Sequence, residues 1–148
     1  MTLESDKVEA FCQRFEEVVS ASIHPELLIP EIIADAEINF NDITPSFFRI
    51  LCQMEPFGPD NLRPVFLTRN VYDTGYSKVV KERHLRFSLK QHGVTWTGIG
   101  FDMADKMELL TSGEPFDVIY KIDENEWNGQ KSLQLRMIDV KPHEIQRN

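Results

Sequence analysis

The first hydrophobic pattern along the chain has the period of a helix. Apolar side chains recur at Val8, Phe11, Phe15 and Val18, which is the i, i+3, i+4, i+7 spacing of an amphipathic helix. Such a helix needs a partner surface for its apolar stripe. Two prolines end this segment, because proline removes a backbone donor and restricts the residue before it. Residues 32–38 then alternate between apolar and acidic side chains, which predicts a half-buried strand.

A second helix is predicted from residues 42–54. Thr44 can cap its N-terminus, and Pro45 then takes the first helical position, where proline is tolerated. Phe47, Leu51 and Met54 would form its apolar face. Residues 55–64 contain three prolines and a glycine, which predicts a loop and a boundary.

From residue 64 onward the hydrophobic period is two. Alternation is clearest at residues 84–91, where leucine and phenylalanine alternate with polar and basic residues. The order of elements is strand, strand, strand, helix, strand, strand, at residues 64–72, 84–91, 94–101, 103–110, 116–123 and 132–140. This β-β-β-α-β-β order is typical of the OB fold, although small five-stranded barrels of other connectivity also fit it. We therefore expect a mainly β protein with added helices, namely a five-stranded OB-fold-like Greek-key barrel preceded by an amphipathic helix.

An Asn-Gly pair lies between the last two predicted strands. Asn128 and Gly129 favour a two-residue hairpin turn, because a type I′ turn needs positive φ at both central residues. Trp127 would then lie beside the tip of this hairpin. It could stack on a ligand or cover the edge of its own hairpin.

Composition restricts the class of protein. The chain has 148 residues, 41% of them hydrophobic and 27% charged, which is typical of one globular domain with a small addition. It begins without a signal-peptide pattern and has no apolar run long enough to span a bilayer, so a cytoplasmic location is expected and no membrane partner. Cys12 and Cys52 have no metal-binding or redox spacing and are interpreted as thiols of the core.

The charge is unevenly distributed. The net charge is −8, yet residues 63–92 hold seven Lys and Arg against two Asp and Glu. A solvated strand surface that happens to be basic would explain this stretch. In an OB fold, however, the stretch covers the first two strands and their connecting loop, and oligonucleotides and oligosaccharides bind at such loops and on the face of strands 2 and 3. Cations that follow phosphates and rings that stack on bases are what a single nucleic-acid strand needs.

Other aromatic and glycine positions have plainer interpretations. Tyr120 aligns with the apolar side of its strand and is expected in the core, whereas Trp96 could belong to the core or to the outer binding face. Gly98 and Gly100 are expected to permit a tight bend of the barrel.

Catalytic chemistry has no support in the pattern. The four histidines are scattered, without neighbouring acids at the spacing of a metal site. Asp35 and Glu37 lie on one side of a strand and are interpreted as solvated carboxylates. We therefore expect no catalytic residues and no metal ligands in this chain.

Several segments resemble the C-terminal OB region of RecJ-type single-strand-specific exonucleases. The segment "LCQMEPFGPDNLRPVF" is similar to the PFG-containing segment that leads into that domain, and "HLRFSLKQ", "GIGFDMAD" and "FDVIYKIDENEWNGQKSLQLRMIDVKP" are similar to its later strands. The resemblance covers residues 26–142, and the first helix is similar to the last helix of the preceding DHH-associated domain. Asp60 and Leu62 depart from the family pattern of glycine and proline. The Asp-His-His motifs of the nuclease are absent from the sequence.

The resemblance implies a domain organisation and a function. Residues 1–25 would be the end of the preceding domain, residues 26–142 the OB module with its lead-in strand and helix, and residues 143–148 a tail. The chain would be the single-stranded DNA binding module of a 5′-to-3′ exonuclease acting in DNA repair and recombination. Manganese or magnesium would belong to the absent nuclease core, and the missing nuclease domains and DNA repair proteins would be further partners.

We assign candidate contacts on this basis. Phosphates would be contacted by Arg69, Lys78, Lys81, Arg83, Arg86 and Lys90, and bases would stack on Tyr76 and Trp127. The rival hypothesis is an architectural or protein-interaction OB domain, which braces the nuclease core through the first helix without strong DNA binding of its own.

Overall fold

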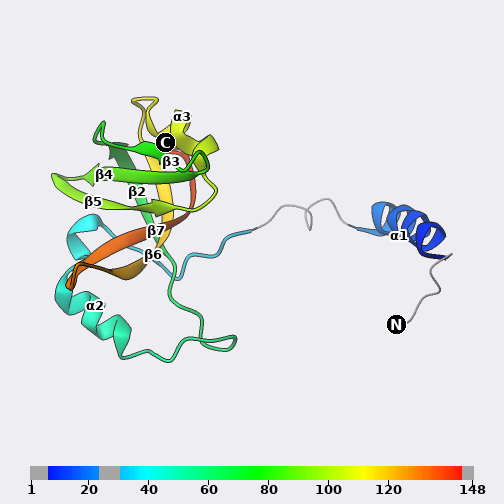
Figure 1. Ribbon diagram of the computed structural model, residues 1–148, viewed down its shortest axis with the longest axis horizontal. Helices are drawn as coiled ribbons and strands as arrows, with labels where there is room; N and C mark the ends of the chain where they lie inside the picture. Colours follow the sequence, from blue (N-terminus) through cyan, green and yellow to red (C-terminus); the bar gives the residue numbers. More distant parts are fainter. Residues whose placement is uncertain (1–6, 24–30, 145–148) are drawn as a thin grey trace. The chain divides into compact units, whose positions relative to one another are not determined.

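The computed structural model describes residues 7–23 and 31–144, apart from the side chain of Trp127. The chain divides into two compact units, Met1–Ile32 and Ile33–Asn148, and each is described by itself (Figure 1).

The helix that the structure describes in the first unit is α1 (Val8–Ser22), as the sequence predicts. Its apolar stripe is exposed: Val8, Phe11, Phe15 and Val18 have exposed fractions of 46%, 39%, 58% and 52%. The Phe11 and Phe15 rings stack on each other with their centroids 5.8 Å apart. The stripe is therefore apolar surface that the described residues of this unit leave uncovered.

The second unit is built on a mixed seven-stranded sheet. The strands are β1 (Ala36–Glu37), β2 (Phe66–Asp73), β3 (Lys78–Val80), β4 (His84–Gln91), β5 (Val94–Gly100), β6 (Phe116–Trp127) and β7 (Gln130–Pro142). Their order in the sheet is β1-β2-β6-β7-β5-β4-β3, and β2 also pairs with β4. The helices of this unit are η3 (Phe40–Asp42), α2 (Pro45–Cys52), η4 (Ala104–Lys106) and α3 (Met107–Leu110). The prediction of a mainly β domain with added helices is confirmed.

Two short strands differ from the sequence prediction. The strand expected over residues 32–38 is reduced to β1, whose two residues are exposed and pair in parallel with β2. The interpretation of Asp35 and Glu37 as solvated carboxylates is wrong. Asp35 Oδ2 accepts from the Val65 amide at 2.8 Å, and Glu37 accepts from Arg69 Nε at 2.8 Å. The second difference is β3, which pairs with β4 within the segment expected to be a loop.

Alternation along the strands produces the core. On β4, Leu85, Phe87 and Leu89 are buried while Arg86 and Lys90 are exposed, because successive strand side chains point to opposite faces. The inner residues of β6 and β7 complete the core, including Phe116, Val118, Tyr120, Ile122, Leu135, Met137 and Val140. The expectation for Tyr120 is confirmed.

The buried Tyr120 hydroxyl has a polar partner. It lies 2.7 Å from the Thr68 hydroxyl, and burial raises the pKa of Tyr120 well above its usual value. A buried hydroxyl without a hydrogen bond would be costly, so this pair allows a polar group at the centre of the core.

Gly98 allows β5 and β7 to approach each other closely. A Cβ atom at this position would lie 1.9 Å from the Leu135 carbonyl oxygen and 2.4 Å from Phe87 Cζ. No side chain fits this space, so glycine is required by close approach of the neighbouring strand.

Trp96 is half-buried and packs against the core. Its indole Nε1 donates to the Phe40 carbonyl oxygen at 3.2 Å. The ring is therefore tied to η3, which decides between the two interpretations of this residue in favour of packing.

Helix α2 begins as the sequence predicts. The Thr44 hydroxyl accepts from the Phe47 amide at 3.1 Å, and Pro45 occupies the first turn. Phe47 and Leu51 pack against the core, and the Phe47 ring lies 5.6 Å from the Phe66 ring in an edge-to-face arrangement. Met54, predicted on the same apolar face, is exposed because it lies beyond the end of the helix. The interpretation of Cys12 and Cys52 as core thiols is wrong, since both are exposed.

Candidate nucleic-acid interface

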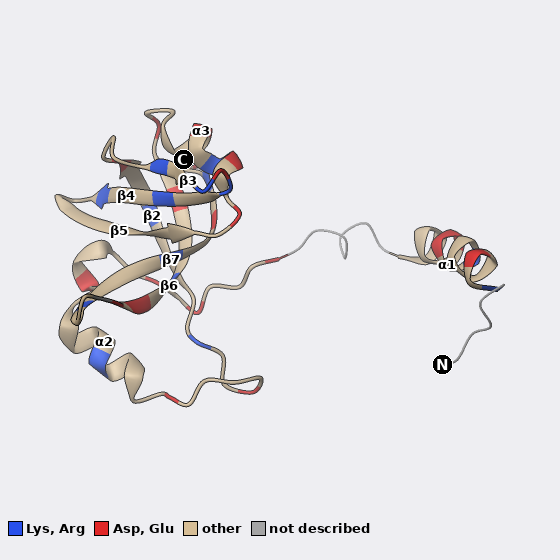
Figure 2. Cartoon of the chain, viewed as in Figure 1, with Lys and Arg blue, Asp and Glu red and all other residues tan. Residues whose placement is uncertain are grey.

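Basic side chains project from the outer face of the sheet. The polar positions of β4 are His84, Arg86, Ser88 and Lys90, of which Arg86 and Lys90 are exposed. Figure 2 shows Lys and Arg along β4 and beside β3. This placement follows directly from the alternation of the sequence.

The register of the strands places four cations in one row. Lys78 on β3 is opposite Arg86 on β4, and Arg86 is opposite Ile99 on β5. Ile99 is in turn opposite Arg136 on β7, and Arg136 is opposite Lys121 on β6. We call Lys78, Arg86, Arg136 and Lys121 the cation row. It crosses five neighbouring strands, although its members are far apart in the sequence.

A second basic position lies along β4 from the cation row. Lys90 is opposite Tyr72 on β2 and Thr95 on β5. Four residues of strand separate Lys90 from Arg86, which is about 13 Å. The Tyr72 ring has an exposed fraction of 38%, so an aromatic ring and a cation are adjacent there.

The cation row is not neutralised by carboxylates. Within the part of the chain that the structure describes, no Asp or Glu forms an ion pair with Lys78, Arg86, Lys90, Lys121 or Arg136. The same holds for Lys81, which lies in the tight turn after β3 with φ of 51°. These charges remain available for an anionic ligand, which is unusual in a chain with a net charge of −8.

Arg69 is held by two carboxylates instead. Its Nε donates to Glu37 at 2.8 Å and its Nη1 donates to Asp117 at 3.2 Å, and these partners raise the pKa of Arg69, Glu37 most strongly. Asp117 is buried and also accepts from the Asn70 amide at 3.1 Å and lies 2.6 Å from His143 Nδ1. Arg69 therefore compensates a buried charge and stabilises the fold.

Arg83 is also paired. It donates to the Asp102 carboxylate, which raises the pKa of Arg83 and lowers that of Asp102. Both side chains are exposed, so this pair contributes little to stability. Its main effect is to reduce the positive charge that Arg83 presents to a ligand.

Tyr76 lies in the loop between β2 and β3 and has an exposed fraction of 82%. The loop is ordered by Asp73, whose carboxylate accepts from the Gly75 amide at 2.5 Å and from the Ser77 hydroxyl. Ser77 in turn accepts from the Ser88 amide of β4 at 3.0 Å. These bonds fix the loop that carries Tyr76 to the strand that carries Arg86.

The hairpin predicted at the Asn-Gly pair is present. Trp127 and Gln130 pair as the last residues of β6 and the first of β7, and Asn128 and Gly129 have φ of 51° and 74°. Positive φ at both positions is what a type I′ turn requires. The side chain of Trp127 lies outside what the structure describes, so its role in stacking stays a prediction.

Three residues of the outer face, Lys121, Arg136 and Phe101, were missed by the assignment of contacts from the sequence. Arg136 alternates with the buried Leu135 and Met137, and this signal is visible in the sequence. Its place in one row with Arg86, with Ile99 between them, depends on strand register. Phe101 follows β5 and is 47% exposed, with the Arg136 Cζ atom 5.1 Å from its ring centroid. Its exposure could not be inferred from the sequence.

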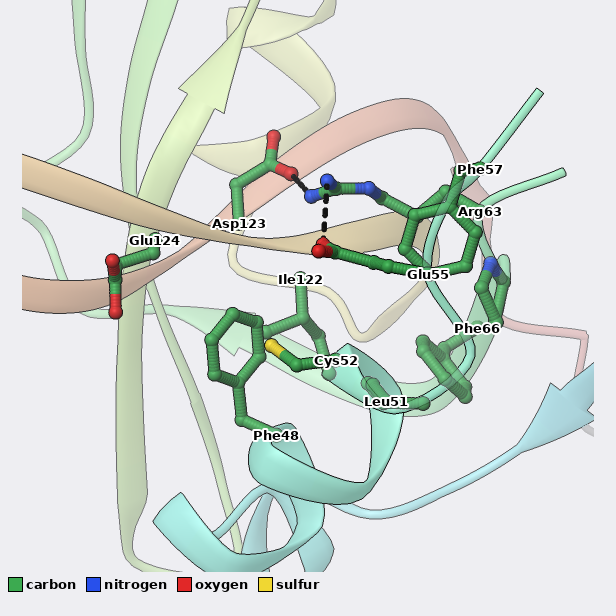
Figure 3. Close-up of a pocket in the computed structure, with 11 residues that line it drawn as sticks. Phe48, Leu51, Cys52, Glu55, Phe57, Arg63, Phe66, Ile122, Asp123 and Glu124 are labelled. Carbon is green, nitrogen blue, oxygen red and sulfur yellow. Dashed lines mark hydrogen bonds and ion pairs between the residues drawn. The ribbon is translucent and has the colours of Figure 1, made fainter.

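A different hollow lies between α2 and β6 and has a volume of about 430 Å³. Figure 3 shows Arg63 against the Phe57 ring and directed toward Glu55 and Asp123. Glu124 is a third carboxylate in its lining. Because carboxylates outnumber the single guanidinium, this pocket is not suited to phosphate.

No metal site is formed by residues 7–23 and 31–144, since no three of their His, Cys, Asp or Glu side chains come together in a group that could hold an ion. None of the helices in these ranges is long and apolar enough to cross a membrane.

Comparisons with known proteins agree with this architecture. The single-stranded-DNA-specific exonuclease RecJ of Salmonella typhimurium is 29% identical over 144 residues, covering 96% of this chain and 25% of the relative. Crystal structures of Thermus thermophilus RecJ in complex with Mn²⁺ and with Mg²⁺ match with TM-scores of 0.70 and 0.65, at 22% and 21% identity. They cover 98% and 97% of this chain, but the chain covers only 20% and 21% of theirs. The chain thus spans about a quarter of the length of the curated relative.

The chain also matches the model of a protein family. The RecJ OB domain family matches residues 34–139, which contain the whole sheet apart from the last residues of β7. The chain therefore belongs to the RecJ OB domain family.

Proposed function

We propose that this chain is the single-stranded DNA binding module of a RecJ-type 5′-to-3′ exonuclease acting in DNA repair and recombination. The observation that carries the proposal is the cation row, which crosses the outer face of the sheet without paired carboxylates. The name of the Salmonella relative, a single-stranded-DNA-specific exonuclease, supports the choice of ligand. The chain would hold the substrate while nuclease domains outside this chain cut it.

The proposal includes a closed OB barrel. The pairing of β2 with both β6 and β4 supports this arrangement, and OB folds bind oligonucleotides on the face formed here by β4 and β5. The phosphates of the strand would be contacted by Lys78, Arg86 and Lys90. Lys81, in the turn after β3, would contact a further phosphate. Arg69 and Arg83 are weaker candidates than the sequence suggested, because carboxylates already hold them. Tyr76 and Trp127 would stack on bases from the two flanking loops.

Catalysis is assigned to the nuclease domains. The Thermus thermophilus structures contain Mn²⁺ or Mg²⁺, and such an ion would serve the intact exonuclease. The described residues of this chain do not fit a divalent ion, since they form no acidic or histidine group of sufficient size. No step of the reaction is therefore assigned to its side chains.

The proposal is tested by reversing one charge of the cation row. Fluorescence anisotropy of a labelled oligothymidylate of about 16 nucleotides, the upper site size of one OB fold, should show salt-dependent binding that is weaker for a matched duplex. Arg86→Glu should reduce affinity and lower the salt slope by at least about 0.7, the contribution of one phosphate on a single strand. The control is Arg49→Glu, which reverses an exposed charge on α2. Equal affinities of Arg86→Glu and the wild type would refute the proposed face.

A brace for neighbouring domains is the second candidate function. The observation that favours it is the exposed apolar stripe of α1, with Phe15 58% exposed. If the stripe is a docking surface, the isolated chain should self-associate at high concentration in light scattering, and Phe15→Asp should restore the monomer. A wild-type chain that is strictly monomeric at all concentrations would argue against this role.

A further inference from the structure

A separate hollow opens beside the end of the cation row. It has a volume of about 380 Å³ and is lined by Phe101, Met103, Lys121, Arg136, Met137 and Ile138. Its apolar part comes from methionine, isoleucine and the phenylalanine ring, while its polar part comes from Lys121 and Arg136. We call it the Phe101 pocket.

The aromatic ring of this pocket is exposed and yet held in place. Phe101 is 47% exposed, and the Arg136 Cζ atom lies 5.1 Å from its centroid. The His84 ring contacts it edge-on, with the centroids 5.4 Å apart. A ring fixed from two sides loses little conformational freedom when a flat ligand stacks on it, and the planar guanidinium of Arg136 can extend the same stacking surface.

The charged side chains that line the pocket are both positive. Both titratable residues of its lining are cations, and neither is paired with a carboxylate of the described residues. The nearest acids in sequence are already engaged, since Asp102 pairs with Arg83 and Asp139 lies 3.5 Å from Lys106 Nζ. The pocket thus combines a stacking surface with positive charge on an acidic protein.

We propose that the Phe101 pocket binds one nucleobase of a single strand together with its flanking phosphates. This inference rests on the proposed function and deepens it, because it assigns a base-stacking site that the two loops do not include. The base would stack on Phe101 and the Arg136 guanidinium, and Lys121 would neutralise an adjacent phosphate. Since Arg136 and Lys121 also belong to the cation row, the strand would run from Lys78 and Arg86 into this pocket.

The test separates stacking from phosphate contact. Anisotropy titrations compare the oligothymidylate with an abasic strand of the same length, which keeps the phosphates and lacks the bases. Phe101→Ala should weaken binding of the oligothymidylate by at least about fivefold, the lower end of the loss of one stacked base. It should leave the salt slope and the binding of the abasic strand unchanged, because no charge is removed. Phe101→Tyr should restore affinity.

Controls separate this inference from the proposed function. Ile50→Ala removes an apolar side chain of 60% exposure on α2 and should change nothing, and circular dichroism checks the fold of each variant. Wild-type binding that Phe101→Ala leaves intact would overturn the pocket while the proposed function stands. A wild-type chain that binds neither strand at low salt would overturn both.

Discussion

At the scale of single residues, glycine and ion-paired side chains show the difference between residue type and role. Gly98 was expected to allow a bend, and the structure gives a more specific reason, the Leu135 carbonyl directly against its Cα. Arg69 is predicted to contact phosphate, and in the structure its guanidinium also pairs with the buried Asp117. The sequence gives the residue type at such a position. The role of the residue depends on the group that it contacts, and in both cases that group lies on a strand distant in the sequence.

Gly98→Ala should strongly destabilise the sheet. The new methyl group would overlap the Leu135 carbonyl at 1.9 Å, so β5 and β7 would have to separate, and the expected loss is about 3 kcal/mol or more in the free energy of unfolding. Urea denaturation followed by circular dichroism measures this quantity.

Gly58→Ala is the matched control for this change. A Cβ at Gly58 meets nothing within 4 Å, so its effect should be close to zero. Similar stabilities of the two variants would show that β5 and β7 are not so closely packed.

At the scale of elements, the sequence predicts the helices and strands whose own residues show a hydrophobic period or a capping pattern. The strands β4 and β7 were predicted from alternation, and α2 from its cap and its proline. The three-residue β3 was missed because its pairing with β4, rather than its own composition, makes it a strand. The cation row was also beyond prediction, since it depends on the register of five strands.

The start of α2 provides a test at this scale. Thr44→Ala removes the hydroxyl that accepts from the Phe47 amide at 3.1 Å, and the loss of such a cap costs about 1 kcal/mol. Because Phe47 packs against the core, the loss should appear in the unfolding of the whole second unit. Thermal denaturation detects it.

Ser46→Ala serves as the control in the same turn. Among the residues that the structure describes, its hydroxyl accepts from the exposed Arg49 side chain at 3.0 Å, so little stability should be lost. A loss as large as that of Thr44→Ala would mean that the cap is not the source of the effect.

At the scale of the whole molecule, the location of charge matters more than its sum. A net charge of −8 taken alone would argue against a polyanionic ligand. The structure gathers Lys78, Arg86, Arg136 and Lys121 in one row, whereas carboxylates such as Glu37 and Asp102 are paired with other arginines. Two members of this row, Lys78 and Arg86, belong to the basic stretch of residues 63–92 that is visible in the sequence. Arg136 and Lys121 lie in residues 93–148, where Asp and Glu outnumber Lys and Arg.

One measurement tests the central claim most directly, namely that the outer face of β4, β5 and β7 binds single-stranded DNA. The isotopically labelled chain would be titrated with oligothymidylate at low salt, and the amide chemical shifts followed by NMR. We predict the largest changes around Arg86, Arg136 and Phe101, with α2 and the acidic hollow beside Arg63 unaffected. Changes confined to α2 and that hollow, or no changes at all, would contradict the account.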